Sequence, residues 1–416
     1  MLGPACCQPL DQAEHERSPL GRRRAKTALR SWQAQLRTAP QCLYPAPAGD
    51  PADRGELGCG WLWSAAASLA LPLIAARTGA SRQLAVLTAL CAVLTLRAGQ
   101  EVCSLPVTVS NRSQRRLRGY VGTLANDGIL TVDVRAARFG ELVRRTAAAT
   151  LRSNHSGPID RADLIGAIAR IEHDRGISYL RAGAFNDLTP YAPPEPDLPG
   201  PPAGPASAAD VQRALRETRF ASMSSPPVEE LLLIILHKIV PEVSLGVMTR
   251  DGLRIPPAEL ESLLRGVEAL LVAAAARDVE LSSLTEITGV EPLPRGPGWL
   301  RTDSCWVELS EAQRLLDDAL GVPAARVFRD PAAPGGAALV AYLVPGNGVQ
   351  TPEQAHAACV AELAGHGRPR RGQPRYTAMA PARYVICARA PLDRSDPTAW
   401  RQQPVLAAST GRRPSH

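Results

Sequence analysis

Three neighbouring stretches decide the fold: LRAGQEV at Leu96–Val102, LPVTVSNR at Leu105–Arg112 and GYVGTLAN at Gly119–Asn126. Before them, the uncharged run Gln83–Leu96 has the length and composition of a buried helix, and the β-branched residues of 102–109 are typical of a buried strand. Helical spacing of apolar residues returns after Phe139 and again after Leu164. Because both segments should lie on a sheet, the expected fold class is α/β.

Two uncharged runs, Leu57–Ala76 and Gln83–Leu96, raise the question of a membrane anchor. A spanning helix needs about 20 predominantly apolar residues. The first run only just reaches that length, contains Pro72 and divides into a strand followed by a helix, and the second run is too short. We therefore expect buried core elements and no membrane association.

Proline marks the breaks between the larger parts of the chain. The proline-rich stretch 189–206 cannot pair in a central strand and is predicted to be an extended connector inside the first domain. After it, 230–240 and 243–247 predict two strands of a hairpin, with a turn at 250–252. Pro256 and Pro257 then open the clearest amphipathic helix of the chain.

A second break at 292–298 precedes a smaller α+β domain. Strands are predicted at 306–309, 325–328, 338–344 and 382–388. Ser310 with Gln313 predicts one helix cap, and Thr351 with Gln354 predicts another. The resulting division is a loose segment at 1–30, a first domain at 31–293, a second at 300–400 and a tail at 401–416.

The net charge of +7 comes almost wholly from arginine, because only two of the 47 basic residues are lysines. The densest clusters lie at 22–24, 115–118 and 368–375, without stacking aromatics between them. This pattern argues against nucleic-acid binding and favours solvated loops or a docking surface for an acidic partner. The nine cysteines form no Cys-x-x-Cys pair, which indicates reduced thiols in the cytoplasm and no zinc site.

Neither the histidines nor the short motifs of the sequence predict a catalytic site. His173 stands between Glu172 and Asp174, but consecutive helical residues point in different directions and cannot form an orienting triad. His155 and His237 are expected to be structural. The sequence contains no nucleophile elbow, P-loop or metal-spaced histidine pair. We therefore predict no catalytic residue and no metal site.

The order of motifs from Leu73 to Val134 resembles the C-terminal lobe of nonribosomal-peptide-synthetase condensation domains. In that family a helix, a strand ending in an Asn-Arg pair and a Gly-x-x-x-Asn turn succeed one another, as Asn111-Arg112 and Gly122 to Asn126 do here. Trp32 and its neighbours resemble the Trp-containing segment of the family, so that 30–290 is covered. The resemblance implies a chloramphenicol-acetyltransferase-like lobe.

Several family positions differ in this chain. The arginine after the turn is Thr131 here, the threonine after the asparagine is Asp127, and the catalytic His-His-x-x-x-Asp-Gly motif is not in the chain. Residues 300–400 weakly resemble the C-terminal subdomain of adenylating enzymes, but Pro397 stands near the position of their lysine. A proline cannot supply the ammonium that compensates phosphate charge.

The resemblance implies a component of nonribosomal peptide or related amide biosynthesis that needs a separately supplied catalytic lobe. Its partners would be carrier proteins and synthetase modules, with acyl groups carried on phosphopantetheine and no other cofactor. The substrate-channel candidates that it implies are Gly122, Asn126, Asn111 and Arg112, although turn stabilisation explains the first two equally well and a structural salt bridge explains Arg112 better. The alternatives are a non-catalytic carrier-docking or scaffold protein and a truncated or decayed synthetase fragment, so whether the chain is an enzyme stays open.

Overall fold

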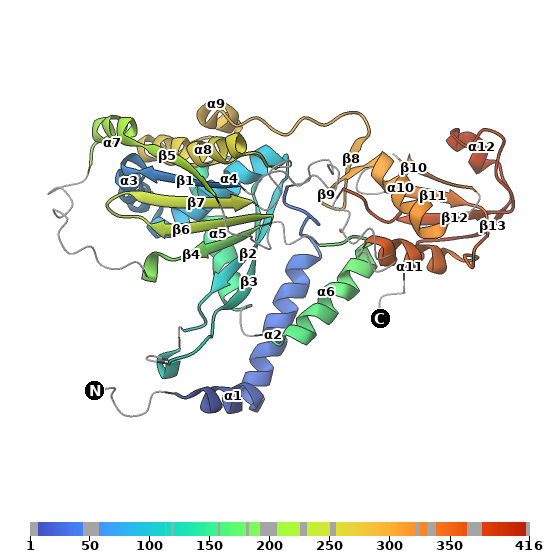
Figure 1. The fold of residues 1–416 in the computed structure, drawn as a ribbon, viewed down its shortest axis with the longest axis horizontal. Helices are drawn as coiled ribbons and strands as arrows, with labels where there is room; N and C mark the ends of the chain where they lie inside the picture. Colours follow the sequence, from blue (N-terminus) through green and yellow to red (C-terminus); the bar gives the residue numbers. More distant parts are fainter. Residues whose placement is uncertain are drawn as a thin grey trace. The chain divides into compact units, whose positions relative to one another are not determined.

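The computed structural model describes residues 7–44, 58–112, 114–117, 120–156, 159–179, 183–191, 206–224, 231–249, 255–321, 324–330, 338–363 and 377–412. The chain divides into two compact units. The first contains Met1–Gln35, Ala52–Leu164 and Arg181–Leu293, and the second contains Leu36–Pro51, Ile165–Leu180 and Pro294–His416. Figure 1 labels the elements of both units in chain order.

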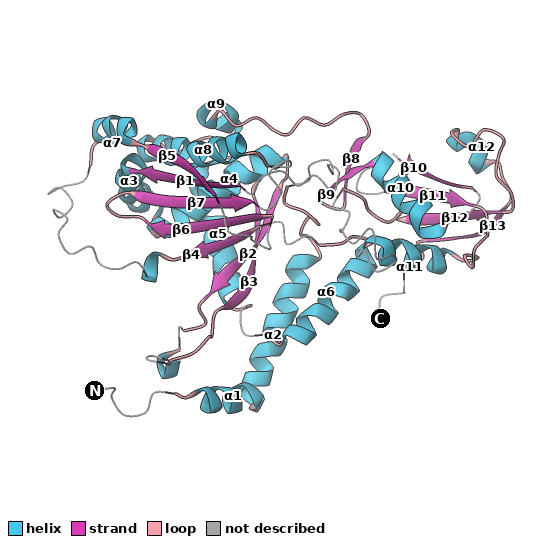
Figure 2. Cartoon of the chain, in the orientation of Figure 1, coloured by secondary structure: helices cyan, strands magenta, loops and turns pink. Residues whose placement is uncertain are grey.

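A seven-stranded mixed sheet forms the centre of the first unit, with the order β3-β2-β4-β6-β7-β1-β5 (Figure 2). Its strands are β1 (Gly58–Ser64), β2 (Val102–Val109), β3 (Asn126–Asp133), β4 (Ala184–Asp187), β5 (Arg219–Ser224), β6 (Leu232–Lys238) and β7 (Val243–Thr249). Strands β2, β4 and β6 run parallel to one another, and the other neighbours are antiparallel. The expected α/β class is confirmed.

Helices cover one face of this sheet. The helices of the unit are α1 (Pro9–Arg17), α2 (Pro19–Leu36), α3 (Ala65–Thr78), α4 (Arg82–Ala98), α5 (Phe139–Asn154), α7 (Ala208–Ala214), α8 (Pro257–Ala276) and α9 (Leu284–Thr288). Helix α8 packs on β1, where Leu260 lies next to Gly58 and Gly60. Helix α5 packs on β3, where Ser153 lies against Gly128. The core therefore sits between the sheet and this helical layer.

Local sequence signals account for most of these elements. The run Leu57–Ala76 divides as predicted into β1 and α3, with Ser64 accepting a hydrogen bond from the Ala67 N–H at the helix start. Helix α4 ends at Gly99, whose φ of 59° is readily adopted by glycine. The hairpin of β6 and β7 is confirmed, whereas the predicted turn at 250–252 lies outside the described residues. Of the proline-rich connector, only its ends are described, with a 3₁₀ turn at Thr189–Tyr191.

The N-terminal segment differs from the loose start that was expected for residues 1–30. Helix α1 begins where the Asp11 carboxylate accepts a hydrogen bond from the Gln8 N–H. Helix α2 follows and buries Ala28, Trp32 and Leu36, which are 0%, 5% and 4% exposed. Their spacing of four residues is helical, but the arginine cluster at 22–24 that precedes them made the segment look polar in the sequence.

The second unit has a four-stranded sheet in the order β10-β11-β12-β13 and a hairpin of β8 with β9. Its elements are α6 (Arg161–Arg175, whose first residues belong to the first unit), β8 (Trp299–Thr302), β9 (Cys305–Glu308), α10 (Leu309–Leu320), β10 (Ala325–Asp330), β11 (Ala338–Leu343), α11 (Pro352–Leu363), β12 (Arg383–Cys387), α12 (Pro397–Arg401) and β13 (Val405–Ser409). One face of the sheet packs with α10 and α11, and the other holds the buried Trp400 of α12. The predicted strands are present.

Three expectations for this unit need correction. Helix α10 begins at Leu309 directly after β9, so Ser310 and Gln313 form no capping box, and Gln313 instead accepts a hydrogen bond from the Val327 N–H. The expected tail at 401–416 contains β13, which pairs with β12. The unit also includes 36–51 and 165–180, which the sequence-based boundaries placed in the first domain.

Within the described residues, no single helix is long and apolar enough to cross a membrane. Only α3 and α4 together pass such a test by length and composition, and they are bent by 98° relative to each other.

Candidate functional site

The loop between β2 and β3 brings together three of the four predicted channel residues. Asn111 follows β2 with a φ of 55°, and its Nδ2 donates to the Leu124 carbonyl at 2.9 Å. Gly122 lies further along the same loop with a φ of 150°, and a Cβ there would come within 2.8 Å of the Tyr120 ring. Glycine at 122 is therefore required by the close approach of the loop to Tyr120.

Arg112 forms hydrogen bonds within this same loop. Its guanidinium donates to the carbonyls of Tyr120, at 2.7 Å, and Gly122, at 2.6 Å. The same group lies over the Tyr120 ring, 5.7 Å from its centre. Because these contacts of Arg112 are with its own loop, the geometry supports a structural role.

Asn126 is at the base of the same loop, as the first residue of β3, opposite Val109. Its Oδ1 accepts a hydrogen bond from the Asp127 N–H at 2.9 Å. Two hollows of the described surface, of about 390 and 280 Å³, are lined by other residues. The role of Gly122, Asn126, Asn111 and Arg112 in a substrate channel thus remains a prediction.

The face of the seven-stranded sheet opposite the helices is a second candidate. Cross-strand partners share a face, and Trp61 is paired with Gly246, which is paired with Ile235. Leu233 and Met248 continue the same face, and these apolar side chains are only partly buried. By contrast, Leu232 and Ile234 on the helical side are 0% and 1% exposed. We call this partly exposed surface the open sheet face.

Aromatic side chains concentrate at one end of the open sheet face. Trp61 and Trp63 stack with their ring centres 6.2 Å apart, and His237 meets Trp61 edge-on at 6.3 Å. A Cβ at Gly246 would lie 2.7 Å from the Trp61 indole, so the ring passes directly over that glycine. Arg219, which is paired with Glu242, lies 5.5 Å above the Trp63 ring. The result is a flat aromatic surface with a cation at its edge.

A buried arginine forms the main polar cluster of the second unit. Arg175 pairs with the Asp303 carboxylate at 2.7 Å and also donates to the Asp303 carbonyl. It donates further to the carbonyls of Leu36, at 2.7 Å, and Ala39, at 2.6 Å, and to the Tyr179 hydroxyl. These contacts join three chain segments, so we interpret the cluster as structural.

His173 lies beside a carboxylate and a second imidazole, with its Nδ1 3.7 Å from the Asp174 carboxylate. Its backbone carbonyl accepts a hydrogen bond from Nε2 of the buried His356, at 2.7 Å, and the two rings meet edge-on. Glu172, which precedes His173, accepts from the Tyr179 N–H instead. Burial lowers the pKa of His356 to about 4, so this imidazole is neutral near pH 7.

Burial raises the thiol pKa of several cysteines in the described part of the chain. The described cysteines are free, and burial raises the pKa of Cys305 to about 11 and of Cys359 to about 12. Thiols of such high pKa are poor nucleophiles near pH 7. No group of three potential metal ligands occurs in the described part of the chain.

Comparison with known proteins returns condensation domains among the solved structures. The first condensation domain of the calcium-dependent antibiotic synthetase is 17% identical with a TM-score of 0.46, covering 68% of this chain and 58% of that one. The EpoB cyclization-docking bidomain from Sorangium cellulosum is 16% identical with a TM-score of 0.44, covering 64% and 51%. A condensation domain that releases the chain from the enacyloxin polyketide synthase is 17% identical with a TM-score of 0.42, covering 72% and 54%.

This chain therefore spans less than two thirds of the length of each of these structures. No family model matches the sequence, and no curated protein matches it.

Sequence reasoning missed the open sheet face and the Arg175 cluster. Strand β6 is apolar on both faces, so its alternation between fully and partly buried residues carries no polar signal. Arg175 was hidden for another reason, because its carbonyl partners Leu36 and Ala39 lie 139 and 136 residues away in the chain.

Proposed function

We propose that the first unit is a condensation-type lobe that helps to form amide bonds between carrier-bound acyl groups. A separately supplied lobe would contribute the catalytic histidine, and carrier proteins with phosphopantetheinyl acyl groups would be its partners. The pathway would be nonribosomal peptide or related amide biosynthesis in the cytoplasm. The resemblance of residues 30–290 to the condensation family motivates this proposal.

The open sheet face is the observation that carries the proposal. Helices bury one face of the sheet, while Trp61, Trp63 and Ile235 remain only partly buried on the other. Apolar side chains that stay accessible on a sheet are typical of surfaces that bind a partner or a ligand. A second lobe placed here would complete the burial of the sheet and would enclose a channel between the two lobes.

Reconstitution tests this proposal. The full chain would be mixed with candidate neighbouring lobes and with two carrier proteins loaded with acyl groups, and complex formation and amide product would be measured. We expect a complex and product with a cognate lobe. Absence of both, with every lobe encoded next to this chain, would overturn the proposal.

Substitutions on the open sheet face make the test specific. Trp61→Ala and Trp63→Ala should weaken the complex, because each removes a large aromatic contact. Trp299→Ala is the matched control, since Trp299 is also a partly exposed tryptophan but lies on β8 of the second unit. Equal weakening by the control would argue against the open sheet face as the binding surface.

A non-catalytic carrier-docking or scaffold protein is the second candidate, and a decayed synthetase fragment is its variant. It is favoured by the predicted channel residues Asn111 and Arg112, which bond to carbonyls of their own loop. Pro397, near the position of the adenylating lysine, is the first residue of α12, capped by Asp396. In this case, carrier proteins should bind without any turnover when a catalytic lobe is added.

A further inference from the structure

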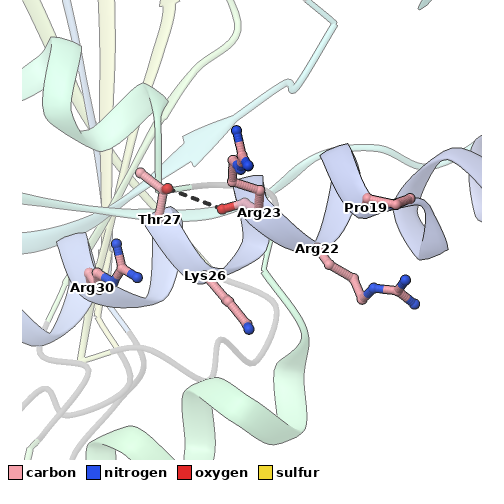
Figure 3. A pocket seen from close by; sticks show the side chains of 6 residues that line it. All are labelled: Pro19, Arg22, Arg23, Lys26, Thr27 and Arg30. Atoms are coloured by element: carbon pink, nitrogen blue, oxygen red, sulfur yellow. Dashed lines mark hydrogen bonds between the residues drawn. The ribbon is translucent and has the colours of Figure 1, made fainter.

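Helix α2 presents a stripe of four exposed cations, Arg22, Arg23, Lys26 and Arg30, which we call the basic stripe. Together with Pro19 and Thr27, these residues line a shallow hollow of about 390 Å³. Figure 3 shows Arg22 and Lys26 extending to one side of the helix and Arg23 and Arg30 to the other. The four cations are therefore accessible to a partner along the length of the helix.

The basic stripe has no counter-charge among the described residues. On other helices, some arginines are paired with a carboxylate three or four residues away; these pairs are Arg145–Glu141, Arg213–Asp210, Arg265–Glu261 and Arg314–Glu311. Helix α2 contains no acidic residue, and no ion pair joins a cation of the stripe to a described carboxylate. Like charges at such spacings repel each other, and this repulsion would be relieved by an anionic partner.

The spacing of the cations fits an acidic helix. Arg22, Lys26 and Arg30 recur every four residues and span about 12 Å along the axis at 1.5 Å per residue. Carboxylates at the same spacing on a second helix would meet them over about two turns. Guanidinium groups also bind carboxylates with two parallel hydrogen bonds.

The same surface is poorly suited to the other anionic partners. Single-stranded nucleic acid is held by aromatic stacking as well as by charge. The one aromatic residue of α2, Trp32, is buried and donates to the Ser156 carbonyl. A helix that lies on a membrane needs an accessible apolar side, whereas the apolar row of Ala28, Trp32 and Leu36 is buried. Leu20 is the one large apolar side chain that α2 exposes among its described residues.

We propose that the basic stripe of α2 binds an acidic helix of a partner protein. The inference stands apart from the proposed amide-forming role, because it uses only the charges and spacing of α2. It assigns a function to an arginine cluster that the condensation-type lobe does not explain.

Binding of a synthetic peptide to the full chain tests this inference. The probe is a helical peptide with glutamate at every fourth position over three turns. A second peptide has the same composition but distributes its glutamates around the helix. We expect the first to bind more tightly, with an affinity that falls as the salt concentration rises.

Charge substitutions then locate the contact. Arg22→Gln, Lys26→Gln and Arg30→Gln together should weaken binding about tenfold, as three exposed ion pairs are lost. Helical content, measured by circular dichroism, should not fall, since the substitutions remove repulsion. The matched control combines Arg144→Gln, Arg216→Gln and Arg389→Gln, which changes the net charge equally on other exposed arginines.

Three results would overturn the inference. They are equal weakening by the control variant, equal binding of the two peptides, and tighter binding of a 20-nucleotide oligonucleotide or of vesicles containing phosphatidylserine. No binding of the first peptide at low salt would also overturn it.

Discussion

Replacing Arg175 with methionine should lower the free energy of unfolding of the second unit by about 3–5 kcal/mol. Arg175 is 7% exposed, and its guanidinium satisfies the carbonyls of Leu36, Ala39 and Asp303. A buried carbonyl left without a donor costs about 1–3 kcal/mol. This loss falls on the carbonyls of Ala39 and Asp303, because the Leu36 carbonyl also accepts from the Tyr179 hydroxyl. Methionine keeps most of the side-chain volume, so the loss reports on the hydrogen bonds and the charge.

Urea unfolding with hydrogen exchange read by mass spectrometry measures this effect. Exchange locates the loss, which should fall on peptides from 36–44, 171–179 and 299–308. Asp303→Asn is the matched control: it removes the counter-charge of the buried guanidinium but keeps a side-chain oxygen that can accept from Arg175, and it leaves the bonds of Arg175 to the carbonyls of Leu36 and Ala39 in place. We therefore expect it to cost less than Arg175→Met. The reasoning is refuted if Arg175→Met leaves stability unchanged, or if Asp303→Asn costs as much.

Three further substitutions test separate features of the two units. Burial lowers the pKa of His356 to about 4, below its ordinary 6.5, so its contribution to stability is complete above pH 6.5 and is lost as the pH falls towards 4, by about 3 kcal/mol. His356→Gln should remove this part of the pH dependence in denaturant titrations, and an unchanged dependence would contradict it. Gly246→Ala should displace the Trp61 ring, lower stability by about 1–3 kcal/mol and shift the tryptophan emission, whereas an unaltered spectrum would show that the ring does not lie over the glycine. Arg112→Met should loosen the β2–β3 loop and speed its cleavage by thermolysin, a protease that does not cut at arginine. Cleavage at the wild-type rate would mean that the Arg112 bonds do not hold the loop.

Local patterns were enough to predict the regular elements where caps and periodicity agree. Helix α4 is bounded by Ser81 and Gly99, and helix α8 begins at the two prolines 256 and 257. The first half of helix α2 was missed because the arginine cluster at 22–24 made it look polar and lowered the periodic signal. The cap at Ser310 was misplaced because β9 runs into α10 without a loop.

The candidate sites depend on contacts that are distant in the sequence. Trp61 meets Gly246 through the pairing of β1 with β7, and its edge-on contact with His237 follows from the neighbouring strand. No local pattern encodes such cross-strand neighbours. By contrast, the loop that holds Asn111, Arg112 and Gly122 is local, and its motif was visible because the residues that bond are thirteen apart or fewer.

The alternation of segments between the two units has a consequence for synthesis on the ribosome. Arg175 and its carbonyl partners at Leu36 and Ala39 emerge early, but Asp303, with which they form one cluster, is made much later. Arg175, in the segment 165–180, therefore lacks its Asp303 partner until the final segment 294–416 has been translated. A gene fragment ending near residue 293 would encode a chain with this arginine exposed, so the second unit cannot be removed or exchanged by a single cut.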